Sequence, residues 1–376
     1  MPVVSARPRS EAPRTRPVRA AALLGTAALL LAGCAPAPPE DSDIASDHAD
    51  YTGCIVSDSG GFDDRSFNQN SYEGVMKTKD DYGIKTKAAE SQAVTDFEPN
   101  INSMLQGGCD LTVTIGFNIA DQTKAAAEAH PDRHFAIVDD DSIQLPNVRP
   151  IIYNTSQAAY LAGYLAAGTT KTGKVATFGG MEIPTVTIFM DGFAQGVAHY
   201  NQVHHTDVKL LGWDAQKQTG SFTGDFEDTG KGKTTAQNFL NEGADIVMPV
   251  AGPVGNGAVD AVTGYNADEP EDPARIIWVD SDGYETLASG QEYVLTSVIK
   301  KMGAAVENAF VDDMDGKFTD TPYVGTLEND GVGLAPFHDQ ASQVPQQLQD
   351  ELDELKQQII DGTVDADSAA SPQTKN

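Results

Sequence analysis

The sequence predicts an α/β protein with two lobes, each built on a doubly wound parallel sheet. Between residues 54 and 300, short continuous runs of Val, Ile and Leu alternate with longer segments of helical character. Such runs are typical of strands covered on both faces, and their alternation with helices is typical of parallel sheets. The roughly 310 residues between the polar ends of the chain exceed one ordinary hydrophobic core, which favours two domains.

The expected elements follow one another regularly along the chain. The expected strands are Cys54–Val56, Lys87–Glu90, Leu111–Ile115, Phe135–Val138, Val148–Tyr153, Val175–Phe178, Val208–Leu211, Ile246–Val250, Ile276–Val279 and Tyr293–Ser297. The expected helices between them are Asn100–Gly107, Ala120–Ala129, Ser156–Gly168, Val186–Tyr200, Lys231–Gly243 and Gly255–Tyr265. A last helix between Val344 and Asp361 is the clearest, because Leu348, Leu352, Leu355 and Ile359 share one face.

The two ends of the chain differ from this pattern. Five arginines and an apolar run precede the sequence Leu31-Ala32-Gly33-Cys34. This order predicts an export signal at residues 1–33 and a bacterial lipobox, in which the lipid is attached to Cys34. An ordinary secretory signal with a chance cysteine is the alternative. Residues 34–51, rich in Pro, Ala, Ser and Asp, predict a disordered tether, and the polar residues 363–376 predict a flexible tail.

The net charge excludes one class of partner. The whole chain carries a formal charge of −30, and the part beyond residue 33 keeps 20 basic and 54 acidic side chains. Such a charge repels nucleic acid and anionic head groups, so no nucleic-acid role is expected.

Polar, glycine-containing stretches follow several of the expected strands. The longest is Asp58–Gly74, where Gly60-Gly61 permits a tight turn and Ser66 with Gln69 fits a capping box. Others begin at Gly116, Gly179, Ala251 and Asp280. A single stretch of this kind more often forms a turn than a binding site. Together, at the carboxyl ends of parallel strands, these stretches would line one ligand cleft.

Known catalytic motifs are missing from the sequence. It contains no Gly-x-Ser-x-Gly, His-Glu-x-x-His or Gly-x-Gly-x-x-Gly pattern. Asp139-Asp140-Asp141 and the pair Asp280 and Asp282 could hold a cation or form a glycosidase-like pair, but acidic clusters are common in so acidic a chain. We therefore expect no catalytic residues, no metal site and no cofactor, with an exported nucleoside-processing enzyme as the less favoured alternative.

Four motifs resemble one known family. The sequence Asp63-Asp64-Arg65-Ser66-Phe67-Asn68-Gln69 resembles the Asp-Asp-Lys-Ser-Phe-Asn-Gln signature of the basic membrane protein family, lipoproteins similar to the purine nucleoside receptor. The stretches 243–257, 279–282 and 295–300 resemble its further signatures, and the likeness covers most of residues 53–362.

The resemblance implies a type I periplasmic-binding-protein fold with two lobes joined by three crossovers. It places residues 52–154 and 281–312 in the first lobe, and residues 155–280 and 313–362 in the second. It implies a lipid-anchored monomer outside the cytoplasm that delivers a purine nucleoside to the permease and ATPase subunits of an ABC importer. A sugar or other small-solute receptor of the same fold, or a surface adhesin, remains an alternative.

The resemblance also implies roles for individual residues. Phe67 would stack on the purine, and Asp64, Asn68 and Asp139 would bond polar edges of the ligand. Asp280 and Lys300 would hold the ribose hydroxyls, while Gly252 would let the backbone approach the sugar. The second stacking ring is expected at Phe222, in Gly220-Ser221-Phe222, with Phe226 as its competitor because residues are inserted before Gly230.

Cys54 and Cys109 predict a disulfide. Cys54 opens the first strand of the first lobe, and Cys109 precedes the third strand, Leu111–Ile115. In a sheet of order 2-1-3 these strands are parallel neighbours, about 4.8 Å apart, within reach of a disulfide. Two unbonded core cysteines are the alternative, since an offset of one residue would point the side chains to opposite faces.

Overall fold

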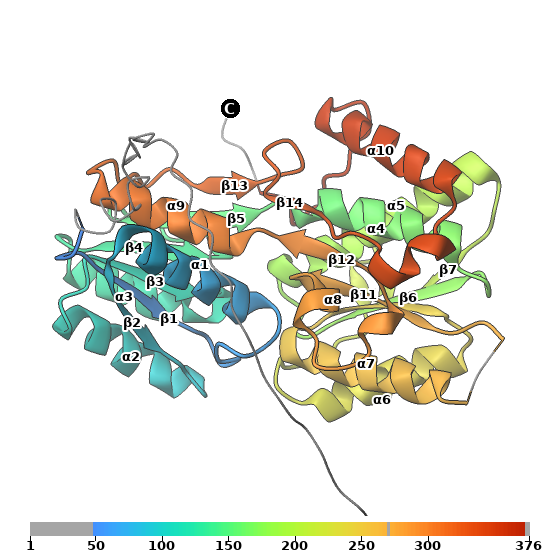
Figure 1. Ribbon diagram of the computed structural model, residues 1–376, viewed down its shortest axis with the longest axis horizontal. Helices are drawn as coiled ribbons and strands as arrows, with labels where there is room; N and C mark the ends of the chain where they lie inside the picture. Colours follow the sequence, from blue (N-terminus) through green and yellow to red (C-terminus); the bar gives the residue numbers. More distant parts are fainter. Residues whose placement is uncertain (1–47, 269–270, 373–376) are drawn as a thin grey trace, which may run out of the picture. The chain divides into compact units, whose positions relative to one another are not determined.

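The computed structural model describes residues 48–268 and 271–372, which contain two six-stranded sheets and a small hairpin (Figure 1). The predicted export signal, the predicted lipid-attachment residue Cys34 and most of the predicted tether lie outside the described residues. Within the described ranges, no helix has the length and apolar character needed to cross a bilayer.

The first sheet has the order β13-β5-β4-β3-β1-β2, and all its strands are parallel. Its strands are β1 (Thr52–Val56), β2 (Lys85–Ala89), β3 (Leu111–Ile115), β4 (His134–Val138), β5 (Val148–Tyr153) and β13 (Tyr323–Gly325). Helices α1 (Phe67–Tyr82) and α9 (Met302–Met314) pack together on one face, and α2 (Val94–Gln106) and α3 (Ala120–Ala129) on the other. The close pairing of α1 and α9 requires glycine, since a Cβ on Gly74 would lie 2.3 Å from the carbonyl oxygen of Gly303.

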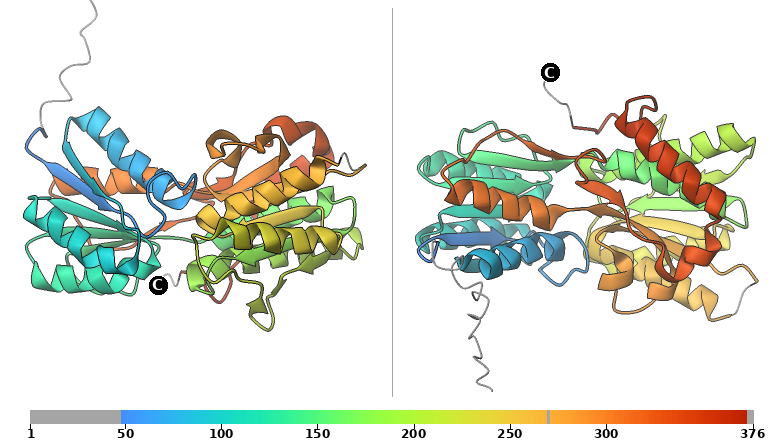
Figure 2. Two further views of the ribbon diagram at one scale, coloured as in Figure 1. Left: turned by 90° about the horizontal axis from the view of Figure 1, so that it is seen from below. Right: turned by 45° about the horizontal axis from the view of Figure 1, so that its top comes forward.

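The second sheet has the order β14-β12-β11-β10-β6-β7, with only β14 antiparallel. Its strands are β6 (Lys174–Gly179), β7 (Lys209–Leu211), β10 (Ile246–Val250), β11 (Arg275–Asp280), β12 (Val294–Lys300) and β14 (Val332–Leu334). Helices α4 (Thr155–Thr169) and α5 (Pro184–His204) form one covering layer, while α6 (Thr229–Asn241) and α7 (Gly255–Asn266) form the other (Figure 2). The predicted last helix is α10 (Gln346–Ile360), whose Leu348, Leu352, Leu355 and Ile359 are all buried.

The chain passes between the two sheets three times, and the passages correct the predicted lobe boundaries. They follow β5, β12 and β13. Residues 281–300 were expected in the first lobe, but β12 pairs with β11 in the second sheet. Residues 313–325 were expected in the second lobe, but the end of α9 and all of β13 belong to the first. A three-residue strand such as β13 carries too little pattern to show which sheet it joins.

The structure joins Cys54 and Cys109 in a disulfide, as the sequence predicts. Their Cα atoms are 5.9 Å apart, and β1 and β3 are parallel neighbours with Cys54 opposite Thr112. Both cysteines are buried in a core that includes Phe97 and Ile101 of α2.

The predicted flexible tail is wrong for the part that the structure describes. Beyond α10, the chain returns to the start of α4, where Ser156 Oγ donates to the carbonyl of Ala366. The Asn154 amide donates to Asp367 Oδ1 over 2.6 Å, at the first passage between the sheets. These two polar contacts, the first of them buried, hold residues 366–367 in place. At the other end, Tyr51 of the predicted tether donates a 2.5 Å hydrogen bond to Asp313.

Candidate ligand-binding site

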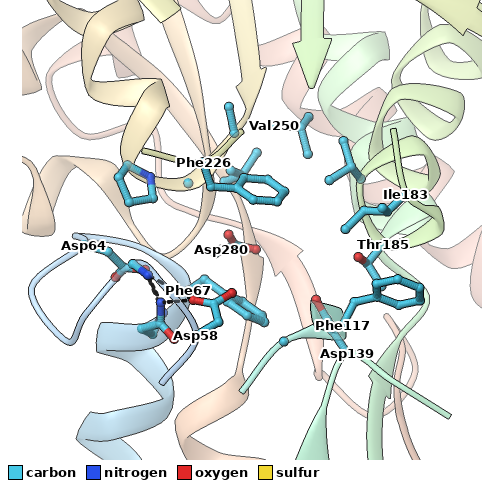
Figure 3. A pocket seen from close by; sticks show the side chains of 18 of the residues that line it. Asp58, Asp64, Phe67, Phe117, Asp139, Ile183, Thr185, Phe226, Val250 and Asp280 are labelled. Carbon is cyan, nitrogen blue, oxygen red and sulfur yellow. Dashed lines mark hydrogen bonds between the residues drawn. The ribbon is translucent and has the colours of Figure 1, made fainter. Parts of the chain in front are cut away.

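A cavity lies where loops from both lobes meet, beyond the carboxyl ends of parallel strands of both sheets (Figure 3). Its empty space is about 630 Å³ with the open mouth included. The first lobe supplies Asp58, Gly60, Asp64, Phe67, Asn68, Gly116, Phe117, Asn118 and Asp139. The second supplies Ile183, Thr185, Val186, Phe189, Phe226, Val250, Ala251, Gly252, Pro253, Val279, Asp280 and Lys300. Seven of the eight predicted ligand-binding residues therefore line one cavity.

The loop before α1 is organised by Asp64, which replaces the expected capping box. The side chain of Ser66 makes no capping bond to the helix. Instead, the Asp64 carboxylate accepts from the backbone N–H groups of Ser66 (3.0 Å), Asn68 (2.8 Å) and Gln69 (3.0 Å). Burial raises the pKa of Asp64 to about 6, although these three donors oppose the shift. Asp64 thus holds the loop that presents the next residues.

Asp58 is a cavity residue that the sequence analysis did not place in the site. The Asn68 amide donates to Asp58 Oδ1 over 2.8 Å and fixes this carboxylate beside Asp64 (Figure 3). Burial raises the pKa of Asp58. Its position could have indicated this role, because Asp58 lies two residues beyond the first apolar strand. Ligand-binding side chains of parallel sheets gather at the carboxyl ends of the strands.

Lys300 links two carboxylates at the floor of the cavity. Its side chain is 3% exposed, ion-pairs with Asp139, and places Nζ 3.7 Å from Asp280 Oδ1. The ammonium also lies 4.9 Å from the ring centroid of Phe67 and 5.6 Å from that of Phe189. Burial raises the pKa of Asp139, against the opposing effect of Lys300.

Both carboxylates sit on unusual backbone. Asp139 follows β4 with φ of 64°, and Asp280 ends β11 with φ of 70°. Left-handed backbone at a non-glycine residue costs energy and is concentrated at functional sites. These turns aim the two side chains at Lys300 from opposite lobes.

The second aromatic ring of the cavity is Phe226. It lines the cavity across from Phe67, whereas Phe222, the predicted residue, does not line it (Figure 3). Phe222 packs edge-on against Trp213, with ring centroids 5.9 Å apart, and covers Gly179. The structure therefore contradicts the choice of Phe222 and places its competitor, Phe226, at the cavity.

Further cavity residues from the second lobe were not predicted at all. Ile183, Thr185, Val186 and Phe189 come from the start of α5 and make an apolar wall. A helix start rich in β-branched residues has the same sequence pattern whether it lines a binding site or packs in a hydrophobic core.

The lining combines four phenylalanine rings, of which Phe67 and Phe226 face each other, with four carboxylates and one ammonium. Carboxylates accept hydrogen bonds, so the set suits a flat ligand that carries several N–H or O–H donors. Within residues 48–268 and 271–372, no group of three or more His, Cys, Asp or Glu side chains is arranged to hold a metal ion.

Comparison with known proteins agrees with this geometry. Residues 52–369 match the family described as "ABC transporter substrate-binding protein PnrA-like". The "ABC transporter nucleoside-binding protein BmpA" of Lactococcus lactis subsp. cremoris is 33% identical over 327 residues, 84% of this chain and 88% of that protein. The "CD4+ T-cell-stimulating antigen" of Listeria monocytogenes is 31% identical, over 84% of this chain and 87% of that protein.

Solved structures confirm the predicted fold. A solute-binding protein of an ABC transporter system from Aeropyrum pernix K1 superimposes with a TM-score of 0.76 at 24% identity, over 86% of this chain and 94% of that chain. Proteins of this class bind a small-molecule ligand, work with permease and ATPase subunits, and are not enzymes. The chain belongs to the PnrA-like, or basic membrane protein, family of ABC transporter substrate-binding proteins.

Proposed function

We propose that this protein captures purine nucleosides between its lobes and delivers them to an ABC importer. The observation that carries the proposal is the pair of rings, Phe67 from the first lobe and Phe226 from the second, on opposite sides of one cavity. Two rings from different lobes can cover both faces of a planar base only when the lobes are together. Stacking of this kind is worth about 1–3 kcal/mol per base.

The polar groups divide into two sets around these rings. Asp58 and Asn68 form one set, joined by their 2.8 Å hydrogen bond, and would face the polar edge of the base. Asp139, Asp280 and Lys300 form the other set and would hold the ribose hydroxyls. Gly252, with φ of 50°, would let the backbone approach the sugar. Asp64 would act indirectly, since its oxygens already accept the backbone N–H groups of the loop.

The charge of the cavity favours nucleosides over nucleotides. Four carboxylates and a single ammonium line it, and that ammonium is already paired with Asp139. A phosphate would meet repulsion and find no free cation among the described lining residues. The hydroxyls and N–H groups of a nucleoside would find acceptors. The Lactococcus relative is named a nucleoside-binding protein, which supports the same ligand class.

The proposal places the protein outside the cytoplasm, anchored through a lipid on Cys34. It rests on the basic, apolar and Leu-Ala-Gly-Cys order of residues 7–34, which lie outside the described residues. Labelled fatty acid should be incorporated into the wild-type protein in cells and not into Cys34→Ala. Equal incorporation into both would contradict the anchor.

Isothermal titration of the purified protein tests the ligand class. Adenosine, guanosine and inosine should bind, whereas ribose, free bases and the corresponding 5′-monophosphates should bind much more weakly. Binding of a sugar without any response to the three nucleosides would instead support a sugar receptor of the same fold. A monophosphate that binds as tightly as its nucleoside would contradict the charge reasoning.

A further inference from the structure

One backbone carbonyl of the first lobe is surrounded by donors of the second. The Ser281 hydroxyl donates to the carbonyl oxygen of Arg65 over 2.8 Å. The Thr286 hydroxyl lies 3.0 Å from the same oxygen and 3.1 Å from the carbonyl of Asp282, so its one proton is shared between the two acceptors. The Trp278 indole N–H lies 3.4 Å from the Arg65 oxygen. Thr286 belongs to α8 (Gly283–Thr286), the short helix that follows β11. All three donors are thus built on the second sheet, whereas Arg65 precedes α1 on the first.

The residue that offers this carbonyl has a strained backbone. Arg65 has φ of 63°, in the left-handed region that disfavours side chains other than glycine, and its own side chain is exposed. Strain of this kind persists only where the surroundings impose it. Here the surroundings include the donors of the other lobe, so the conformation of Arg65 is coupled to the approach of the lobes.

The strained carbonyl lies next to the ligand cavity in sequence. Ser66 follows, and its hydroxyl lies 3.0 Å from Asp280 Oδ2 and 3.2 Å from the carbonyl of Val279, again across the lobes. Phe67, the ring of the cavity, comes next. A shift of the Arg65 carbonyl therefore displaces the stacking ring directly.

We propose that Ser281 and Thr286 are positioning residues for ligand capture. By holding the Arg65 carbonyl they fix Phe67 against the ligand and stabilise the closed arrangement of the two lobes. Neither residue lines the cavity, so they act through the loop rather than through contact with the ligand. The ligand part of this inference rests on the proposed nucleoside function, but the closing part does not.

The test compares the double variant Ser281→Ala, Thr286→Val with the wild-type protein. Loss of the two hydroxyls beside the Arg65 carbonyl should raise the dissociation rate of guanosine or inosine about tenfold in stopped flow, with little change in the association rate. Small-angle X-ray scattering without ligand should show a larger radius of gyration. The variant Ser281→Thr, Thr286→Ser keeps both hydroxyls and should restore both values. Ser289→Ala, at an exposed position of the same segment, is the matched control.

The outcomes separate this inference from the ligand assignment. Should no nucleoside bind the wild-type protein, the proposed function fails, and the scattering measurement still decides whether the two hydroxyls hold the lobes together. An unchanged radius of gyration together with an unchanged dissociation rate would overturn the inference. So would a variant that only melts earlier, because a purely structural role lowers the melting temperature without changing the dissociation rate.

Discussion

Replacing Lys300 with methionine tests whether one buried ammonium offsets the cost of burying two carboxylates. The ammonium is paired with Asp139 and lies 3.7 Å from Asp280 Oδ1. Two unit charges at that distance attract by about 4 kcal/mol at an effective dielectric constant of about 20. Methionine preserves most of the side-chain volume but leaves two buried carboxylates without a cation. We expect the free energy of unfolding at pH 7 to fall by about 3–5 kcal/mol.

Urea unfolding at constant ionic strength measures this loss, and two further variants sharpen it. Adding Asp139→Asn to Lys300→Met should recover a large part of the stability, because one unpaired charge is then removed. Lys301→Met is the matched control, since the neighbouring ammonium is half exposed and pairs with Asp330 on the surface. Its loss should stay below about 1 kcal/mol. Equal losses for Lys300→Met and Lys301→Met would refute the reasoning.

Three further predictions concern the rings, the disulfide and the pH dependence. Phe226→Leu should weaken nucleoside binding at least tenfold in calorimetry, whereas Phe222→Leu should lower stability and leave affinity within about twofold. A larger loss of affinity for Phe222→Leu than for Phe226→Leu would instead support Phe222 as the second stacking ring. Replacing Cys54 and Cys109 with alanine releases a loop of 55 residues. It should cost about 4 kcal/mol on the chain-entropy model, and a loss below about 1 kcal/mol in urea unfolding would contradict this. Burial raises the pKa of Asp64 from 3.8 to about 6. The stability gained from its protonated form is therefore complete below about pH 4 and is lost, by about 3 kcal/mol, as the pH rises through about 6. Asp64→Asn should flatten the melting temperature between pH 4 and 7, and an unchanged slope would exclude Asp64 as the cause.

The sequence predicted the long central strands well because burial on both faces leaves a continuous apolar run. Leu111–Ile115 and Ile246–Val250 were placed with their observed bounds. The prediction failed for strands that pair only with strands far away in the sequence. Tyr323–Gly325 gains its identity as a strand only beside β5, some 170 residues earlier in the chain. The lobe boundaries shifted for the same reason.

Most site residues were predicted from the family signatures and not from the local chemistry of the sequence. Asp280 and Lys300 were placed through motifs at the ends of β11 and β12, and the structure brings them together across adjacent strands. Phe222 was predicted from its Gly-Ser-Phe context, yet Phe226, four residues later, lines the cavity instead. Side-chain direction in an irregular loop depends on tertiary contacts that a motif does not encode.

The three passages of the chain between the sheets bear on the order in which the protein folds. The side of α1 that packs against α9 stays uncovered until α9, more than 200 residues later in the chain, has joined the first sheet. Until then the first lobe keeps apolar surface exposed to solvent. Incompletely folded chains in this condition aggregate or recruit chaperones. The cysteine pair is different, since both partners lie among the first strands made. Its bond can close before α9 joins the sheet, and it would then hold β1 against β3 while the rest of the lobe is still unfolded.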